Sequence, residues 1–175
     1  MADVPVSAID REEWFDVCNA ADFVIGKARR SIVHAQDLLH RAVHIWVWDK
    51  QSRLVLQKRT TKKDQYPLCY TSSASGHVDA GEDYETAAQR ELSEELGLSG
   101  PLSFRLKLPA GPVTAFEHTV LYELVTDATP QPDPEEILSL EVLTAAEITD
   151  RVSRHPEKFT PPFLELWRAI YTGRS

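Results

Sequence analysis

The chain has 175 residues, a length that suits one domain with one sizeable hydrophobic core. Hydrophobic residues make up 42% and charged residues 26%, the balance of an ordinary soluble globular protein. The net charge of −8 and the pI near 5.2 argue against nonspecific nucleic-acid binding, which needs a broad basic surface, but they leave room for a small anionic substrate beside a metal or a local basic cluster.

The first half of the chain is predicted to contain a hairpin, two strands and two helices. In chain order these are a hairpin from residues 14–18 and 23–28, a weak helix at 30–39, strands at 42–49 and 53–59, a polar loop at 60–67 and a helix at 83–96. The last helix has the clearest pattern, because Ala88, Leu92 and Leu96 form an apolar stripe and Gly97 suits the helix end.

The second half is predicted to contain three strands and two terminal helices. They are strands at 102–108, 119–125 and 138–143, a Pro-rich loop at 129–136, a helix at 144–154 and an amphipathic helix at 163–171. Thr144 and Glu147 have the spacing of a capping box. Strands around one central helix predict a mixed α+β layered fold in one domain, residues 1–175, with a hairpin extension at about residues 12–30.

Cysteine usage and apolar patterning predict a cytoplasmic protein that does not enter a membrane. Cys18 and Cys69 fit neither a zinc ligand set nor a redox pair, so we expect reduced thiols. Residues 1–10 contain no apolar signal core. The longest apolar stretches, such as residues 42–48, are interrupted by His44 and too short to span a bilayer.

Three glutamates on the helix at 83–96 form the most informative cluster. Glu91, Glu94 and Glu95 stand at i, i+3 and i+4, so they share one helix face, with about 5–6 Å between neighbouring Cβ atoms. Like charges this close are unfavourable unless a cation lies among them, and Mg²⁺ takes carboxylate and phosphate oxygens. Arg90 is placed to hold one carboxylate. For the three glutamates alone, a solvated acidic face is the alternative.

The residues around these glutamates resemble a known motif. Residues 76–98 are GHVDAGEDYETAAQRELSEELGL. This segment is similar, position by position, to the box of the Nudix hydrolase superfamily, G-x5-E-x7-R-E-U-x-E-E-x-G-U, where U is apolar. The matching residues are Gly76, Glu82, Arg90, Glu91, Leu92, Glu94, Glu95, Gly97 and Leu98.

The resemblance implies an α/β/α Nudix sandwich with a mixed central sheet and a metal-dependent hydrolase. It implies that Glu91, Glu94 and Glu95 bind Mg²⁺ or Mn²⁺, which would activate a water for attack on phosphorus. We assign the role of general base to Glu94. Which glutamate has this role differs between members of the family.

The resemblance also implies supporting roles for other residues. Arg90 and Glu82 would orient the carboxylates, and the Gly76 carbonyl is a further candidate metal ligand. A further carboxylate from outside the box is often needed in this family. The unranked candidates for it are Glu117, Glu135 and Glu136.

A second resemblance concerns the segment before the box. The run LHRAVHIWVWDKQSRLVLQKRTTKKDQYP, followed by SGH, is similar to type I isopentenyl diphosphate isomerases and to their hydrolase relatives, the YfcD-like Nudix proteins. On that template Arg59 and Lys63 match diphosphate-binding positions, although residues 58–63 would also suit a solubilising loop. The matched metal ligands are His40, His77 and Glu117, of which Glu117 is also catalytic.

Departures from the isomerase pattern favour hydrolysis. The isomerase needs a cysteine two positions before the second matched histidine, and the chain has Ser75 there, which is a much poorer acid and base. Cys69 lies six residues upstream, so it is a poor replacement. An additional isomerase metal histidine falls near Val33, which leaves His34 one residue out of register.

Several alternatives remain open at this point. His40 and His77 are either metal ligands or inherited structural residues, and the aromatic residues Trp46, Trp48 and Tyr70 either stack a base or belong to the core. The favoured function is a pyrophosphohydrolase acting on a nucleoside diphosphate derivative or a similar small diphosphate. The alternatives are an isopentenyl diphosphate isomerase and a noncatalytic nucleotide-binding module. Homodimerisation is left open.

Overall fold

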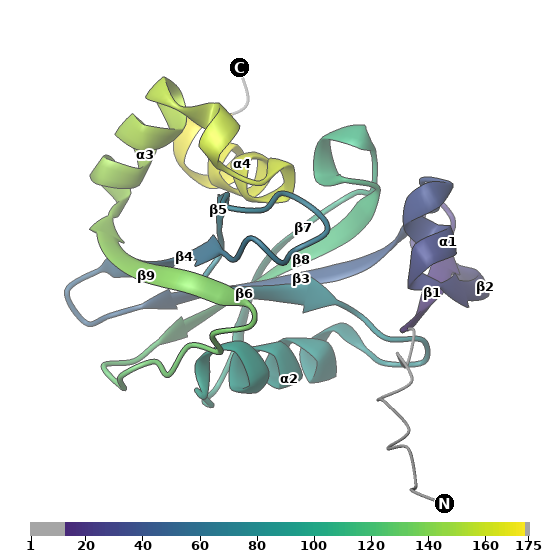
Figure 1. Ribbon diagram of the computed structural model, residues 1–175, viewed down its shortest axis with the longest axis horizontal. Coiled ribbons are helices and arrows are strands. Elements are labelled where there is room, and N and C mark those ends of the chain that lie inside the picture. Colours follow the sequence, from purple (N-terminus) through teal and green to yellow (C-terminus); the bar gives the residue numbers. More distant parts are fainter. Residues whose placement is uncertain (1–12, 174–175) are drawn as a thin grey trace, which may run out of the picture.

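The computed structural model describes residues 13–173 and shows a three-layer arrangement (Figure 1). A central sheet is covered on one face by α2 (Tyr84–Leu96) and on the other by α3 (Ala145–Arg154) and α4 (Pro161–Trp167). This layering confirms the mixed α+β fold that the sequence predicts. The prediction that residues 1–10 hold no signal core lies outside the described residues, as does the start of the hairpin extension at residue 12.

The central sheet is mixed and has seven strands. The strand order is β5-β4-β3-β8-β7, with β6 paired to β3 and β9 paired to β4. Only β3 and β8 run parallel, and the other pairs are antiparallel. The strands are β3 (His40–Trp48), β4 (Arg53–Arg59), β5 (Tyr70–Thr71), β6 (Ala74–His77), β7 (Ser103–Leu108), β8 (Glu117–Val125) and β9 (Ile137–Thr144).

Strand β3 supplies side chains to both hydrophobic layers. Val43, Ile45 and Val47 pack with the α2 side of the core, whereas Trp46 packs among the residues of α3 and α4. This division follows from the period of two along a strand. Because His44 differs from Trp46 by two positions, it projects from the same face.

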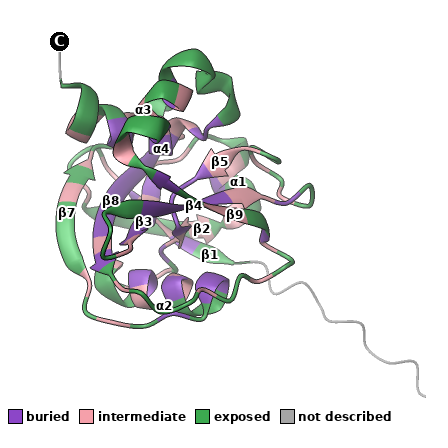
Figure 2. Cartoon of the chain, turned by 90° about the vertical axis from the view of Figure 1, so that its left-hand side faces the viewer, coloured by how far each residue is buried: buried purple, intermediate pink, exposed green. Residues whose placement is uncertain are grey.

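Helix α2 has a defined beginning and end, as its sequence predicts. Asp83 is the N-cap, and its side chain accepts a hydrogen bond from the Thr86 amide. Gly97 ends the helix in the left-handed conformation, with a φ of 61°. Figure 2 shows buried and exposed stretches alternating along α2, as expected for a helix with one face on the sheet. This fixed geometry holds the box glutamates at one edge of the sheet.

The N-terminal hairpin pairs β1 (Trp14–Cys18) with β2 (Val24–Arg29) and is followed by α1 (Arg30–Ala35). The hairpin is confirmed, but the helix is shorter than the predicted range of 30–39 because Asp37 adopts a positive φ of 51°. Near the C-terminus, the capping box of Thr144 and Glu147 is confirmed. The last predicted helix divides into α4 and a π-helical turn at Arg168–Thr172, and short 3-10 turns lie at Pro112–Thr114 and Pro156–Lys158.

Both cysteines are free thiols, with Cys18 buried and Cys69 partly buried. Within residues 13–173, no helix combines the length and the apolar character needed to cross a membrane.

Candidate active site

A cavity of about 420 Å³ lies where the sheet opens between β3 and β4. These two strands pair only at Trp48 and Leu54, so their other ends diverge. The wall of the cavity combines side chains from β3, β4, β6, β8 and α2. Of the residues predicted for the site, the cavity is lined by Gly76, Arg90, Glu91, Glu94, Glu95, Arg59, Lys63, His77, Glu117 and Glu136, but not by Glu82, His40 or Glu135.

Gly76 allows α2 to approach strand β6 closely. A Cβ atom at this position would lie 2.1 Å from Cδ of Glu91, so the end of the Glu91 side chain would have to move. The glycine in the first position of the box therefore has a steric reason: it leaves room for the carboxylate of Glu91. Gly76 belongs to β6 and lines the cavity.

Two box glutamates are shielded from solvent, Glu95 fully and Glu91 in large part. Glu95 is only 4% exposed, and its carboxylate accepts hydrogen bonds from Nε2 of Gln57 at 2.8 Å and from the Ser75 amide at 3.0 Å. Burial raises the pKa of Glu95, and burial together with the nearby Glu95 carboxylate raises the pKa of Glu91. Buried carboxylates with raised pKa values are a donor set that lacks positive charge, which fits a hard divalent cation such as Mg²⁺.

Arg90 connects the carboxylates of the box through its guanidinium group. It forms a bidentate pair with Glu82, with N···O distances of 3.0 and 2.9 Å, and contacts Glu91 at 2.7 Å. The Arg90 pKa is raised, mainly by its hydrogen bond to Glu82. Glu94 points outward, with 62% of its side chain exposed, and lies 3.4 Å from Arg90. Glu82 thus holds Arg90 by this ion pair and does not itself line the cavity.

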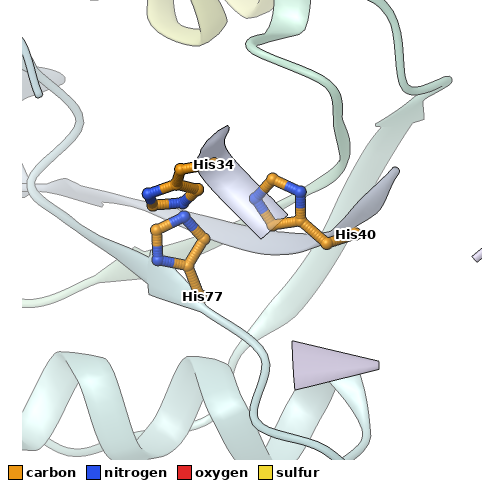
Figure 3. Close-up of side chains that lie close together, drawn as sticks. All are labelled: His34, His40 and His77. Carbon is orange, nitrogen blue, oxygen red and sulfur yellow. The ribbon is translucent and has the colours of Figure 1, made fainter. Parts of the chain in front are cut away.

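Three histidines form a second cluster at the same cavity (Figure 3). The ligand atoms of His34, His40 and His77 all lie within 4.8 Å of one another, and Figure 3 shows their rings gathered above α2. Glu117 adds a carboxylate 3.3 Å from Nε2 of His77 and 3.9 Å from Nε2 of His40. His34 thus joins the other two histidines from helix α1, although it is one residue out of register with the isomerase pattern.

The state of these histidines fits a metal site better than a structural role. Nε2 is buried in His34, His40 and His77 and has no hydrogen bond partner among the described residues. Burial lowers the pKa of His34 and His40 to about 4 and that of His77 to about 3, so all three rings are neutral at neutral pH. Neutral imidazoles with free lone pairs suit a first-row divalent metal.

The basic cluster at 58–63 divides between the cavity and the surface. Arg59 and Lys63 line the cavity, and Lys63 forms an ion pair with Glu136. By contrast, Lys58 lies over the ring of Tyr70, 5.5 Å from its centroid, and Lys62 pairs with Glu135 at 2.5 Å. Two cations therefore remain at the cavity to face an anionic substrate.

The aromatic residues considered for base stacking do not line the cavity. Trp46 is fully buried in the core, the Trp48 indole donates to Glu123, and the Tyr70 hydroxyl donates to Glu141. The core alternative is therefore the correct one for Trp46. Instead, the cavity contains His44 and Tyr66, which the sequence did not single out as site residues. A period of two from His40 along the strand was the available signal for His44.

Comparison with known proteins agrees with this architecture. A family model described as the NUDIX domain matches residues 38–163. The chain belongs to the Nudix family. Membership supports a pyrophosphohydrolase type of activity in general terms, and members of this family generally use divalent metal ions.

Relatives of this Nudix protein fall into two named groups. A protein of Serratia proteamaculans named isopentenyl-diphosphate Delta-isomerase is 36% identical over 165 residues, covering 91% of this chain and 92% of the relative. The uncharacterized Nudix hydrolase YfcD of Shigella flexneri is 41% identical over 88 residues, covering 50% and 49%. The crystal structure of DR0079 from Deinococcus radiodurans superposes with a TM-score of 0.78 at 30% identity, covering 91% of this chain and 99% of that one. These findings confirm the isomerase-like and YfcD-like branch of the family.

Proposed function

We propose that this Nudix protein is a metal-dependent pyrophosphohydrolase that cleaves a phosphoanhydride bond in a nucleoside diphosphate derivative or a similar small diphosphate. The proposal rests on one observation: carboxylates and cationic side chains line the same cavity. The buried carboxylate of Glu95 and the partly buried carboxylate of Glu91 lie on one wall, and the cations of Arg59 and Lys63 lie on another. A diphosphate with its counter-ion needs both.

The residues of the cavity divide the chemical work. Arg59 and Lys63 would bind the diphosphate oxygens, and Arg90 would hold Glu91 in place. Mg²⁺ or Mn²⁺ bound to the box carboxylates supplies Lewis acidity and neutralises negative charge. Glu94, the most exposed of the three glutamates and part of the cavity wall, would accept the proton of an attacking water. The water oxygen forms the new bond to phosphorus, and the bridging oxygen leaves with the other phosphate.

The test is a metal-supplemented screen of nucleoside diphosphate derivatives, dinucleoside polyphosphates and prenyl diphosphates, with products identified by mass. On the best substrate, Glu95→Gln and Glu94→Gln should each lower kcat by at least about 100-fold. Glu85→Gln is the matched control, because Glu85 is exposed in the first turn of the same helix and does not line the cavity. Full activity in both site variants would refute the assignment, and tight ligand binding without hydrolysis would favour a noncatalytic module.

A second candidate, isomerisation of isopentenyl diphosphate, is favoured by the cluster of His34, His40, His77 and Glu117. It is opposed by Ser75, because a hydroxyl is a poor acid and base at carbon. Cys69 does not line the cavity, so it cannot replace the missing thiol. Conversion of isopentenyl to dimethylallyl diphosphate by the purified, metal-loaded protein would establish this candidate over hydrolysis.

A further inference from the structure

His44 and Ser72 form a buried polar pair in the floor of the cavity. Nδ1 of His44 lies 2.7 Å from Oγ of Ser72, and Nε1 of Trp46 lies 2.9 Å from the same oxygen. All three residues are at least 96% buried, since the exposed fraction is 4% for His44 and 0% for the other two. His44 also lines the cavity. A chain of hydrogen bonds therefore runs from Trp46 in the core, through Ser72, to His44 in the cavity wall.

The hydrogen bonds of this group determine where His44 carries its proton. An indole N–H can only donate, so the Ser72 oxygen accepts from Trp46. The single hydroxyl hydrogen of Ser72 then has one acceptor among the described residues, Nδ1 of His44. Because burial lowers the pKa of His44 to about 4, the ring is neutral and has one N–H. Nδ1 is the acceptor, so the hydrogen is on Nε2.

Nε2 of His44 has no hydrogen bond partner in residues 13–173, and the ring borders the cavity. Ser75 lies directly opposite His44 in the pairing of β3 and β6, so both side chains project from the same face. The hydroxyl of Ser75 likewise has no partner within that part of the chain, and it also lines the cavity. The floor thus presents two neutral hydrogen bond donors side by side.

Two unpartnered donors determine which ligands this floor accommodates. A ligand with hydroxyl, ether or carbonyl oxygens satisfies them, whereas a hydrocarbon group would remove them from water without replacing their hydrogen bonds. A site built to donate hydrogen bonds discriminates strongly against an analogue that lacks the acceptor.

We propose that His44, held in the Nε2–H tautomer by Ser72, selects diphosphates whose attached group carries acceptor oxygens and disfavours prenyl diphosphates. His44 is thus a specificity-determining residue, and Ser72 positions it. The inference rests on the proposed function for the diphosphate end of the ligand. It adds the chemical class of the group attached to that diphosphate, in which sugar-like and nucleoside groups fit and branched hydrocarbons do not.

The binding test uses two probes that hydrolysis does not consume, the methylene-bridged analogues of ADP-ribose and of dimethylallyl diphosphate, titrated in Mg²⁺ by calorimetry. The wild type should bind the ADP-ribose analogue more tightly. His44→Leu should weaken that binding by about 5- to 150-fold and should change the Kd of the prenyl analogue by less than about threefold. His155→Leu, the same change at an exposed histidine outside the cavity, should alter neither Kd.

Three results would overturn the inference. They are equal weakening of both probes by His44→Leu, a wild-type preference for the prenyl analogue, and binding of neither probe. Because the probes report binding alone, these results are separate from a failure to hydrolyse any substrate.

The tautomer has its own readout in the ¹⁵N resonances of labelled histidine. The resonances of His44 are assigned by their loss in His44→Leu. Wild-type protein should show a neutral ring protonated at Nε2, and protonation at Nδ1 would contradict the role of Ser72. Ser72→Ala should give a mixture of tautomers and weaken only the ADP-ribose analogue; should this variant not fold, the wild-type spectrum alone decides the tautomer.

Discussion

At the scale of single residues, the protonation state of the box glutamates connects structure to metal binding. Burial raises the pKa of both Glu91 and Glu95, while Arg90 provides the nearest positive charge to Glu91. Without a cation, the carboxyls therefore retain protons at a pH where exposed glutamates have lost them. Metal binding requires the ionised form, so it must displace these protons.

The first prediction is that Mg²⁺ binding releases protons near neutral pH and becomes tighter as the pH rises from 6 to 8. The raised pKa of Glu95 also determines whether its contribution to stability rises or falls with pH. In the metal-free protein, its contribution is present while the carboxyl is protonated and is lost as the pH rises through the raised pKa. The increase in Tm produced by Mg²⁺ should thus grow with pH. Calorimetry in buffers of different ionisation enthalpy measures the released protons, and a pH-independent affinity without proton release would contradict the prediction.

The candidate site was only partly predictable from the sequence, for a geometric reason. Glu91 and Glu95 could be found because helix periodicity relates them within a few residues. His34 could not be assigned by register, because the way the short helix α1 packs beside β3 and β6 is a property of the assembled fold. His44 was missed because its surroundings come from segments distant in sequence, including Ser72 and Ser75.

At the scale of secondary structure elements, the end of α2 depends on one glycine. Gly97 has a φ of 61°, a conformation that costs other residues about 1–2 kcal/mol. A Cβ atom there would also lie 3.4 Å from Cβ of Gln131. We predict that Gly97→Ala lowers Tm by about 2–8 °C in a thermal melt. Gly111→Ala is the control and should leave Tm unchanged, because Gly111 has an extended φ of 178° and an added Cβ atom would meet open space. Equal effects of the two substitutions on Tm would contradict the explanation.

The carboxylate of Asp22, in the turn of the N-terminal hairpin, links the hairpin to the sheet and to α2. Asp22 accepts hydrogen bonds from Arg41 at 2.7 Å, from Tyr84 at 2.8 Å and from Lys107. Burial opposes ionisation of Asp22, but the bonds from Lys107, Arg41 and Tyr84 outweigh it and lower the pKa to about 2. The stability that this carboxylate contributes is therefore present above its unfolded pKa, near 4, and is lost as the pH falls toward 2.

We predict that Asp22→Asn lowers the free energy of unfolding by about 2 kcal/mol at pH 7, measured by urea denaturation. The difference from wild type should shrink as the pH is lowered from 4 toward 2. Asp37→Asn is the matched control, because Asp37 is exposed and asparagine tolerates its positive φ. A loss that stays constant across this pH range would show that the charge of Asp22 is not the cause.

Most regular elements followed from the sequence because their periodicity extends over many residues. Strands β3, β4, β7, β8 and β9 and helix α2 lie within a few residues of their predicted ranges. Strands β5 and β6 were not predicted, because two and four residues are too few to show alternation. Their existence depends on β3 and β4 diverging, and this divergence is a property of the assembled sheet. The cavity was unpredictable for the same reason.

At the scale of the whole molecule, the cavity places cationic side chains inside an acidic protein. The chain carries a net charge of −8, yet Arg30, Arg59 and Lys63 line the cavity. We therefore expect a small anion that can reach these cations to bind better than a long polyanion that must also face the acidic outer surface. The box glutamates line this cavity, and the histidine cluster borders it through His77, its one member in the cavity wall.

The most direct test of the central claim is a crystal structure with Mn²⁺ and a methylene-bridged diphosphate analogue, with the ions located by anomalous scattering. We predict an anomalous peak bound by Glu91 and Glu95, with the analogue between that ion and the side chains of Arg59 and Lys63. An anomalous peak at the three histidines alone, with no ion at the glutamates of α2, would contradict the proposal that the box carboxylates hold the metal that drives hydrolysis.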